Sequence, residues 1–400
     1  MRAPFRSDAV IRLELGSMGF CLRFLRRVPT ERITGPRRSR TRQPRSVRVN
    51  PEGVLAGVAA PPLRTGWLRR HVSGKNHDVL DLFAQAEPEI KTKLRQVAQR
   101  LATGNIFIGT SSWKYPEWCG QIYDRERYVY RGKFAETRFD RDCLTEYAEV
   151  FKTVCVDAAY HRFPSRDFLS GLASQVPQDF RFTLKVTEDI TIKRFPSIAK
   201  FGAKAGLPNE HFLNAELLEH SFLSACEGIR PKVGLLIFEF SRYYPADFRH
   251  LHDFTALLDA FLAKLPKGWN YGVELRNKDW LQPDYFALLQ KHAVVHVFNN
   301  WSAMPTVGEQ MVVPSSETSD SMVAARFLLK PGRKYEEAVK AFSPYKSVKE
   351  VNDEARAAGK KLIVGAKQQG KQAFIYVNNR LEGNALETIA AMTEGLDLVR

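Results

Sequence analysis

Carboxylate side chains stand at or just beyond the ends of apolar runs. Glu239 ends the run VGLLIFEF, Glu274 ends YGVE, and Asp157 follows TVCV. Neighbouring strands lie about 4.8 Å apart, so Glu239 and Glu274 on adjacent strands could approach to about 5 to 8 Å, a separation used by acid/base and nucleophile pairs. Such proximity would split their pKa values. We predict that Glu274, Glu239 and Asp157 are catalytic; the alternative is that each only neutralises a nearby cation.

Cationic side chains occupy comparable positions. Lys185, Arg276 and Arg326 each stand near the end of an apolar run, and Lys330 and Arg333 follow the last of these runs. Guanidinium groups bind phosphate or carboxylate in a bidentate manner, which favours an anionic ligand. An alternative of equal weight is that these cations only form ion pairs with Asp157, Glu239 and Glu274.

Aromatic, amide and imidazole groups complete the predicted binding set. Flat aromatic faces stack on sugar rings or bases, and paired amides can hydrogen-bond a polyhydroxylated ligand. Loop packing and turn formation are the alternatives for these groups. The predicted binding residues of this kind are Trp113, Tyr115, His161, Asn378 and Asn379, with Asn299 and Asn300 as a second amide pair.

Eight strand-like runs alternate with helical sequence and must position these residues. The stripe from Phe254 to Leu265 is the clearest helix, and Val79 to Leu101 is read as a leading helix. Eight βα repeats with near-continuous apolar strands predict an α/β fold, a closed (β/α)8 TIM-like barrel with its site at the carboxyl ends of the strands. The expected strands are residues 106–111, 153–159, 180–186, 233–240, 271–276, 294–298, 322–329 and 373–378.

A doubly wound open sheet is the runner-up. This fold is less favoured because the sequence has no GxGxxG after a strand and no phosphate-binding GxxxxGK[ST] loop. A GxSxG nucleophile elbow is also missing, which disfavours a covalent serine hydrolase.

Three separated segments of the chain match known motifs in the same order. The segment from Gly109 to Trp118 matches GTSxWxYxxW, Glu274, Arg276 and Trp280 match ExRxxxW, and the segment from Val377 to Ala385 is similar to FNNxxxGxAxxNA. On these motifs, residues 105 to about 395 resemble the TIM-barrel family of domain of unknown function 72 (YecE-like), which is described as related to sugar isomerases. The resemblance implies a barrel and a shared site, but no established activity.

Two segments depart from the family pattern. Where the family commonly has ExNxxFYxxP, this chain has Cys155, Asp157, Tyr160, His161 and Pro164. Where the family often has FQLPP, the chain has Phe238, Glu239, Phe240 and Ser241. A carboxylate thus replaces an amide at two positions and a glutamate is lost at a third, which suggests a divergent branch with a different substrate.

The net charge of +16 is concentrated near the N-terminus. The first 50 residues hold thirteen arginines, no lysine and three acidic residues, an excess of +10 that leaves +6 for the remainder. We expect residues 1–75 to be a disordered Arg-rich extension and residues 76–400 to be a single barrel domain. A misassigned start is the favoured reading of the extension; a nucleic-acid or membrane tail and an organelle transit peptide are the alternatives.

Cysteine usage and hydropathy indicate the compartment. The five cysteines are scattered without a CxxC pair, and no apolar run approaches the roughly 18 residues that span a bilayer, so we expect a cytoplasmic protein without a membrane partner. Cys155 is expected to be a buried apolar residue, and the close pair His250 and His252 a surface feature. No metal-ligand spacing is visible; if a divalent metal such as Mg or Mn were used as cofactor, the carboxylates would bind it.

These observations predict an enzyme acting by acid/base chemistry, isomerase-like or hydrolase-like, on a small polar, anionic, sugar-like or phosphorylated compound. Glu274 would act as the general acid or base, and Arg276 with Lys185 would hold the anion. The alternative is a non-catalytic protein that binds nucleic acid or a nucleotide through a basic barrel mouth. The sequence leaves the oligomeric state open.

Overall fold

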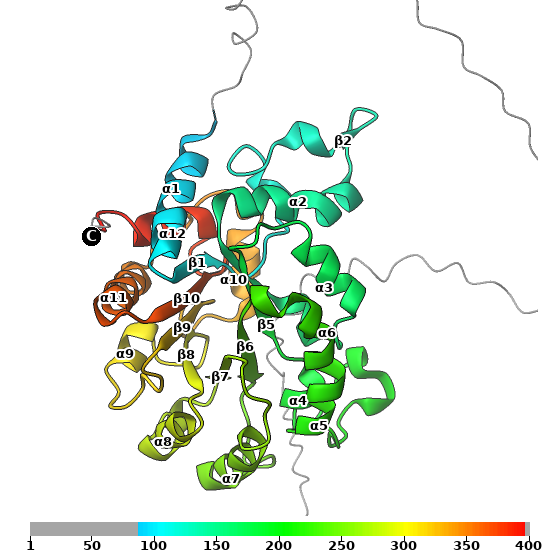
Figure 1. The fold of residues 1–400 in the computed structure, drawn as a ribbon, viewed down its shortest axis with the longest axis vertical. Coiled ribbons are helices and arrows are strands. Elements are labelled where there is room, and N and C mark those ends of the chain that lie inside the picture. The colour runs from blue at the N-terminus through cyan, green and yellow to red at the C-terminus, as the bar shows by residue number, and fades with distance from the viewer. Residues whose placement is uncertain (1–86, 397–400) are drawn as a thin grey trace, which may run out of the picture. The chain divides into compact units, whose positions relative to one another are not determined.

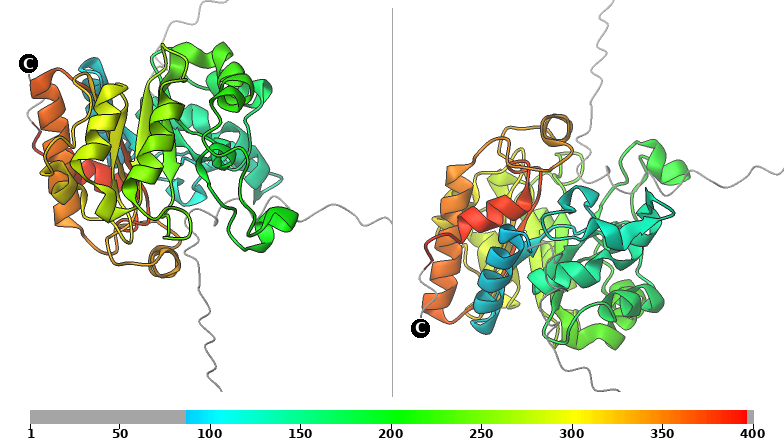
Figure 2. Two further views of the ribbon diagram at one scale, coloured as in Figure 1. Left: turned by 90° about the horizontal axis from the view of Figure 1, so that it is seen from below. Right: turned by 90° about the horizontal axis from the view of Figure 1, so that it is seen from above.

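Eight parallel strands close into a barrel in the computed structural model, which describes residues 87–396 (Figure 1). The strand order is β1-β10-β9-β8-β7-β6-β5-β4, with helices outside the ring (Figure 2). This is the predicted (β/α)8 barrel rather than the open sheet. The barrel strands are β1 (Ile106–Thr110), β4 (Thr153–Val156), β5 (Arg181–Lys185), β6 (Val233–Phe240), β7 (Tyr271–Leu275), β8 (Val295–Asn300), β9 (Met322–Phe327) and β10 (Gln372–Val377).

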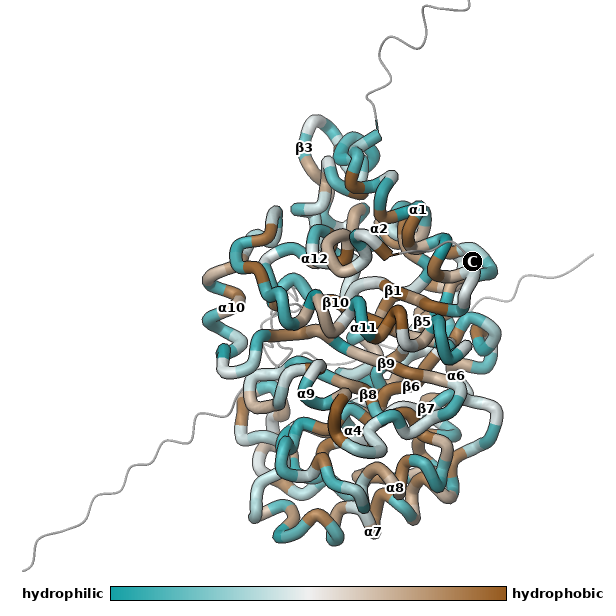
Figure 3. Tube along the Cα trace, turned by 90° about the vertical axis from the view of Figure 1, so that its left-hand side faces the viewer, coloured by the Kyte–Doolittle hydropathy of each residue, from teal (hydrophilic) through white to brown (hydrophobic). Residues whose placement is uncertain are grey.

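The helices follow the strands in chain order and pack their apolar faces against the barrel. The strands are mostly brown and the outer helices alternate teal and brown in Figure 3, as expected for strands covered on both faces. The α-helices are α1 (Glu89–Thr103), α2 (Glu136–Val150), α3 (Arg166–Ala173), α4 (Glu188–Thr191), α5 (Ala215–Leu217), α6 (Ser224–Cys226), α7 (Leu251–Leu262), α8 (Pro283–Lys291), α9 (Val307–Met311), α10 (Tyr335–Phe342), α11 (Asp353–Gln369) and α12 (Ala385–Met392).

Shorter elements occupy the connections. A hairpin of β2 (Val129–Tyr130) and β3 (Lys133–Phe134) lies between β1 and α2, and its two-residue strands were too short to be predicted. The 3-10 and π turns are η2 (Pro116–Trp118), η3 (Arg125–Tyr128), η4 (Asp157–Tyr160), η5 (Ala199–Lys204), η6 (Leu218–Leu223), η7 (Glu227–Lys232) and η8 (Lys278–Trp280).

The predicted strands all exist, but several boundaries were wrong. The second barrel strand ends at Val156, because Asp157 to Tyr160 turn into η4. Conversely, β8 runs on to Asn300, since Asn299 and Asn300 pair with Arg326 and Phe327 of β9. This strand was expected to end at Phe298.

The leading helix begins at Glu89 and not before Pro88, because proline disfavours a helical conformation in the residue that precedes it. The expected extension, residues 1–75, lies outside the described residues. The part of the expected leading helix before residue 87 also lies outside them. In the described part of the chain, no helix is long and apolar enough to cross a membrane.

Most of the stripe predicted for α7 is buried, including Phe254, Leu258 and Phe261. Leu257 is an exception, with 47% of its surface exposed, and Leu265 lies beyond the helix end. The four cysteines of the described residues are free, and Cys155 is fully buried in β4, as predicted.

Candidate active site

Alternation along the strands divides the barrel interior into an apolar part and a polar part. Phe107, Leu235, Val295 and Phe374 belong to an apolar cluster formed by alternate strand residues. Because side chains on a strand alternate between its two faces, the next inward positions toward the carboxyl ends include Glu239, Asn299 and Arg326. The interior therefore changes from apolar to charged along the barrel axis.

Six charged side chains meet at this polar end, and we call them the mouth cluster. They are Asp157, Lys185, Glu239, Glu274, Arg276 and Arg326. Each was predicted as a site residue, and the fold brings all six together.

Glu239 lies at the centre of the mouth cluster. Its Oε2 accepts a hydrogen bond from Arg326 Nη1 at 2.8 Å and forms ion pairs with Lys185 Nζ at 2.7 Å and with Arg276 Nη2 at 2.8 Å. Burial alone would raise the pKa of this carboxyl, but the charges of Arg276, Lys185 and Arg326 together lower it well below its usual value. Glu239 is therefore ionised at neutral pH and cannot donate a proton there.

Glu274 binds both guanidinium groups. Its Oε1 accepts from Arg276 Nε at 3.1 Å and Nη2 at 3.0 Å, and its Oε2 accepts from Arg326 Nη1 at 2.5 Å. Burial alone would lower the pKa of Arg326, but Glu274 and the neighbouring acids raise it well above its usual value. The arginine stays charged although it is almost fully buried.

Asp157 differs from the other five residues in its accessibility. Its side chain is 32% exposed, whereas those of Lys185 and Glu274 are 1% and 0% exposed. Its Oδ1 lies 3.6 Å from Lys185 Nζ and 3.3 Å from Arg326 Nη2. Asp157 is thus the carboxylate of the mouth cluster that a ligand can reach from solvent.

The charges of the mouth cluster balance, with three cations and three carboxylates in mutual contact. The predicted alternative of mutual pairing is therefore present in the geometry. An anionic group that entered the cluster would have to displace a carboxylate.

Aromatic rings cover two of the three cations of the mouth cluster, and one of these rings, that of Trp301, was not predicted to belong to the site. Lys185 Nζ lies 3.9 Å from the centre of the Tyr160 ring, and Arg276 Cζ lies 3.9 Å from that of Trp301. Cation–π contacts of this kind hold a charged group in place without neutralising it. Trp301 follows the inward Asn299 by two residues, which is the signal that could have identified it.

Several buried polar atoms near the carboxyl ends of the strands have no protein hydrogen-bond partner within residues 87–396. They are Ser111 Oγ, Thr187 Oγ1, Asn299 Oδ1 and Arg326 Nε. Buried polar atoms are normally paired, and unpaired ones are common where a site binds water or ligand. The polar end of the barrel therefore retains unused hydrogen-bonding capacity.

The predicted aromatic residues pack within the loop after β1. Trp113 and Tyr115 are 5% and 3% exposed and belong to the apolar core. The Trp113 carbonyl accepts a hydrogen bond from the Tyr123 hydroxyl, and Tyr115 contacts the ring of Trp118 at 4.6 Å. This geometry favours the loop-packing alternative over ligand stacking.

The remaining predicted binding residues make local contacts. Asn378 Oδ1 accepts from Arg380 N at 3.0 Å, and Asn379 Oδ1 accepts from Ala385 N at 2.7 Å, at the start of α12. His161 Nδ1 lies 2.9 Å from Lys200 Nζ, which also binds Glu188. Both amides thus serve turns or a helix start, as their alternative predicted.

Lys330 and Arg333, expected near the mouth, both bind Glu350 instead, at 2.8 Å and 2.6 Å. Their positive charges are therefore shared with a carboxylate on the loop before α11.

A divalent metal does not fit the mouth cluster. Its three carboxylates already bind cationic side chains, and those cations would repel a metal ion. Among residues 87–396 no group of three or more His, Cys, Asp or Glu is placed to hold a metal. His250 and His252 are exposed at the start of α7, as expected.

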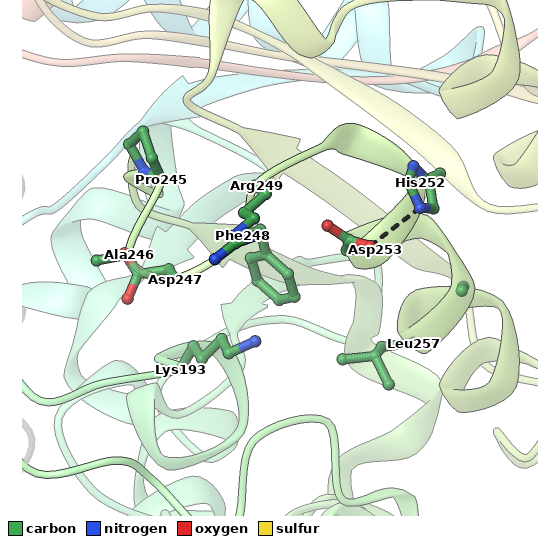
Figure 4. A pocket seen from close by; sticks show the side chains of 10 residues that line it. Lys193, Pro245, Ala246, Asp247, Phe248, Arg249, His252, Asp253 and Leu257 are labelled. Carbon is green, nitrogen blue, oxygen red and sulfur yellow. Dashed lines mark ion pairs between the residues drawn. The ribbon is translucent and has the colours of Figure 1, made fainter.

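Two adjoining cavities are lined by the loop between β6 and α7, and one of them is also lined by Arg276 of the mouth cluster. The first, of about 380 Å³, is lined by residues from the segments after β6 and β7, including Arg276. The second, of about 530 Å³, is lined by Lys193, Asp247, Phe248, Asp253 and neighbours (Figure 4). Phe248 and Arg249 line both cavities, so the loop between β6 and α7 separates them.

A family model described as protein of unknown function DUF72 matches residues 107–400. The chain belongs to the DUF72 family. The match covers the whole barrel from β1 onward and includes every residue of the mouth cluster. The resemblance inferred from the three sequence motifs is thereby confirmed.

The chain is similar to solved structures of DUF72 family proteins. One from Enterococcus faecalis V583 is 19% identical over 74% of this chain and 98% of its own, with a TM-score of 0.50. Another, from Thermotoga maritima MSB8, is 17% identical over 72% of this chain and 96% of its own, with a TM-score of 0.47. Comparison with curated proteins gives no match.

Proposed function

We propose that this DUF72 protein is an enzyme that acts by acid/base chemistry on a small polar, anionic, sugar-like or phosphorylated compound at the barrel mouth. The observation that carries the proposal is the mouth cluster itself. Six charged side chains are gathered at the carboxyl ends of the strands, next to the apolar cluster formed by alternate strand residues.

Stability alone gives little reason for such a cluster. Removing charges from water costs several kcal/mol per ion, and apolar residues of similar volume often stabilise a core as well or better. The cluster lies at the end of the barrel where enzymes of this architecture have their catalytic residues. Position and energetic cost together support a role in binding or catalysis.

Asp157 is the proposed general base, because it is the accessible carboxylate of the cluster. It would take a proton from a carbon next to a carbonyl group, and the electron pair would move onto the carbonyl oxygen. Lys185 and Arg326, which both lie near Asp157, would stabilise the resulting oxyanion. In an α-hydroxy carbonyl compound, the proton of the α-hydroxyl group would then pass to this oxyanion. Return of the abstracted proton to the former carbonyl carbon would leave a carbonyl group on the α-carbon and complete an isomerisation.

Glu239 and Glu274 are assigned a positioning role in this scheme. Both are fully buried and form ion pairs with Arg276 and Arg326 at distances of 2.5 to 3.0 Å. Glu274, predicted from the sequence as the principal acid or base, therefore acts through the cations that it orients. Hydrolysis of a polar substrate by a water activated at Asp157 would use the same groups.

Proton exchange in D₂O tests the proposal. Sugar phosphates and sugar acids are incubated with the protein, and loss of a C–H signal is followed by proton NMR. We expect exchange with at least one compound and a decrease of about 10²- to 10⁴-fold in Asp157→Asn, the usual contribution of a general base. Asp320→Asn, which changes an exposed aspartate before β9, is the control and should keep the full rate.

Exchange that is equally fast in Asp157→Asn would contradict the assigned base. Absence of exchange and of hydrolysis with every compound, together with oligonucleotide binding that weakens steeply between about 50 and 200 mM salt, would favour the nucleic-acid alternative.

A further inference from the structure

The 380 Å³ cavity beside the mouth cluster has walls that are fixed relative to each other. Asn277, just after β7, accepts from Tyr243 N at 2.9 Å and donates to the Tyr243 carbonyl at 2.9 Å. The two hydrogen bonds join the segment after β6 to the segment after β7. A preformed cavity loses less conformational entropy on binding a ligand than a mobile one.

One wall of this cavity is aromatic. Tyr243 stacks on Trp280 with ring centres 5.8 Å apart, and Trp280 stacks on Phe254 at 5.4 Å. Trp280 is partly exposed and lines the cavity together with Tyr243. Such a wall suits the apolar face of a sugar ring.

The rim of the cavity carries unpaired positive charge. Arg242, Arg249 and Lys278 are exposed, and none of them has an ion-pair partner among residues 87–396. Asp279 is the carboxylate among the lining residues, which leaves an excess of +2. Arg276 lines the same cavity, but its charge is already paired with Glu239 and Glu274.

We propose that this cavity binds the phosphate of a phosphomonoester whose carbon skeleton reaches past Arg276 to the mouth cluster. A phosphomonoester carries about −1.5 to −2 at neutral pH, which matches the excess charge better than the −1 of a carboxylate. The inference rests on the proposed function, and it names the substrate class of that site. Because the phosphate would bind outside the mouth cluster, it would not have to displace a carboxylate there.

Neighbouring sites fit a phosphate less well. Many barrels bind phosphate on the loops after their seventh and eighth strands. Here the cations after β9, Lys330 and Arg333, are both bound to Glu350. The 530 Å³ cavity contains Lys193 and Arg249 together with Asp247 and Asp253, so its charges balance.

Calorimetric titration of the full chain with inorganic phosphate tests the inference. The test variant combines Arg242→Gln, Arg249→Gln and Lys278→Gln. The matched control combines Lys264→Gln, Lys267→Gln and Lys361→Gln, three exposed lysines away from the cavity lining. We expect phosphate to bind the wild type and the control alike, and the test variant at least about tenfold more weakly, a loss of about 1.4 kcal/mol.

Absence of phosphate binding to the wild type, or equal affinity in the test variant, would overturn the inference. Circular dichroism of each variant confirms that it is folded. This experiment and the proton-exchange experiment can fail independently. Weaker phosphate binding in the test variant supports a phosphate site in the cavity even if Asp157→Asn changes no reaction. Unchanged phosphate affinity in the test variant rejects that site even if Asp157 proves catalytic.

Discussion

Residues of the mouth cluster divide by accessibility rather than by type. Glu239 and Glu274 are buried among cations, whereas Asp157 is partly exposed. The sequence identified all six residues, because charges at the ends of apolar runs are unusual. It could not predict which cation each carboxylate contacts, since that depends on strand register and on side chains from five separate segments.

Glu239→Gln should be strongly destabilising. Removing one partner of a buried ion pair leaves uncompensated charge, here on Lys185, Arg276 and Arg326, and costs about 3 to 5 kcal/mol. Asp157→Asn, at the exposed edge of the same cluster, should cost about 1 kcal/mol or less. Urea denaturation at pH 7 measures both; equal losses would show that burial does not distinguish the two carboxylates.

The contribution of Glu239 to the free energy of unfolding should also depend on pH. Because its folded pKa is lowered from 4.5, its ionised form stabilises the fold fully above that value, and the stabilisation is lost as the pH falls toward the folded pKa. The difference in unfolding free energy between wild type and Glu239→Gln should be constant from about pH 6 to 8 and shrink below about pH 4.5. A difference that grows in acid would contradict the ion-pair geometry.

At the level of elements, Tyr147 of α2 joins the first two strands of the barrel. Its hydroxyl accepts from Thr110 N at 3.0 Å and donates to the Thr153 carbonyl at 3.0 Å. The direct pairing of β1 with β4 is limited to Thr110 and Val154. A Cβ at Gly109 would lie 2.3 Å from the Thr153 carbonyl oxygen, so the glycine of the opening motif permits this close approach.

Tyr147→Phe should therefore destabilise the fold by about 1 to 3 kcal/mol, because it leaves buried backbone groups with fewer partners. Tyr130→Phe, at a position that is 61% exposed, is the matched control and should change stability by less than about 0.5 kcal/mol. Thermal unfolding compares the two. Similar melting temperatures for both variants would mean that the hydroxyl does not hold the strands together.

His296 connects β8 to α8. Its Nδ1 lies 3.1 Å from the Tyr285 hydroxyl, and burial lowers its pKa to about 3. A histidine with a lowered folded pKa stabilises the fold above its unfolded pKa of 6.5, and this contribution declines as the pH falls toward 3.

Wild-type stability should consequently fall by up to about 1.4 kcal/mol per pH unit below about pH 6 because of His296. His296→Leu should remove that slope, whatever its effect at pH 7. Urea denaturation between pH 7 and pH 5 measures the slope, and an unchanged slope in the variant would contradict the assignment.

Strand positions were predictable because apolar runs of this length need a sheet buried on both faces. Their ends were less predictable. The strand predicted to reach Ala159 ends at Val156, because residues from Asp157 onward form η4, and the strand predicted to end at Phe298 continues to Asn300. Trp113 was predicted to stack on a ligand or to pack in its loop, and only tertiary contacts favour the second.

For the molecule as a whole, polarity changes along the barrel axis. Its apolar interior, including Phe107 and Phe374, gives way to the mouth cluster, and unpaired cations lie in the loops beyond. A fold that needed only stability would have no reason for this gradient. We therefore expect the mouth cluster and its adjoining cavity to bind one small anionic ligand.

A thermal-shift titration of the full chain with sugar phosphates, uncharged sugars and oligonucleotides tests that claim most directly. A ligand at about 100 times its Kd adds about 2.7 kcal/mol of apparent stability. We expect a saturable rise in Tm with a sugar phosphate for the wild type and for Asp320→Trp, and its loss in Asp157→Trp, whose indole fills the accessible edge of the cluster. No rise with any sugar phosphate, or a rise that persists in Asp157→Trp, would contradict the account.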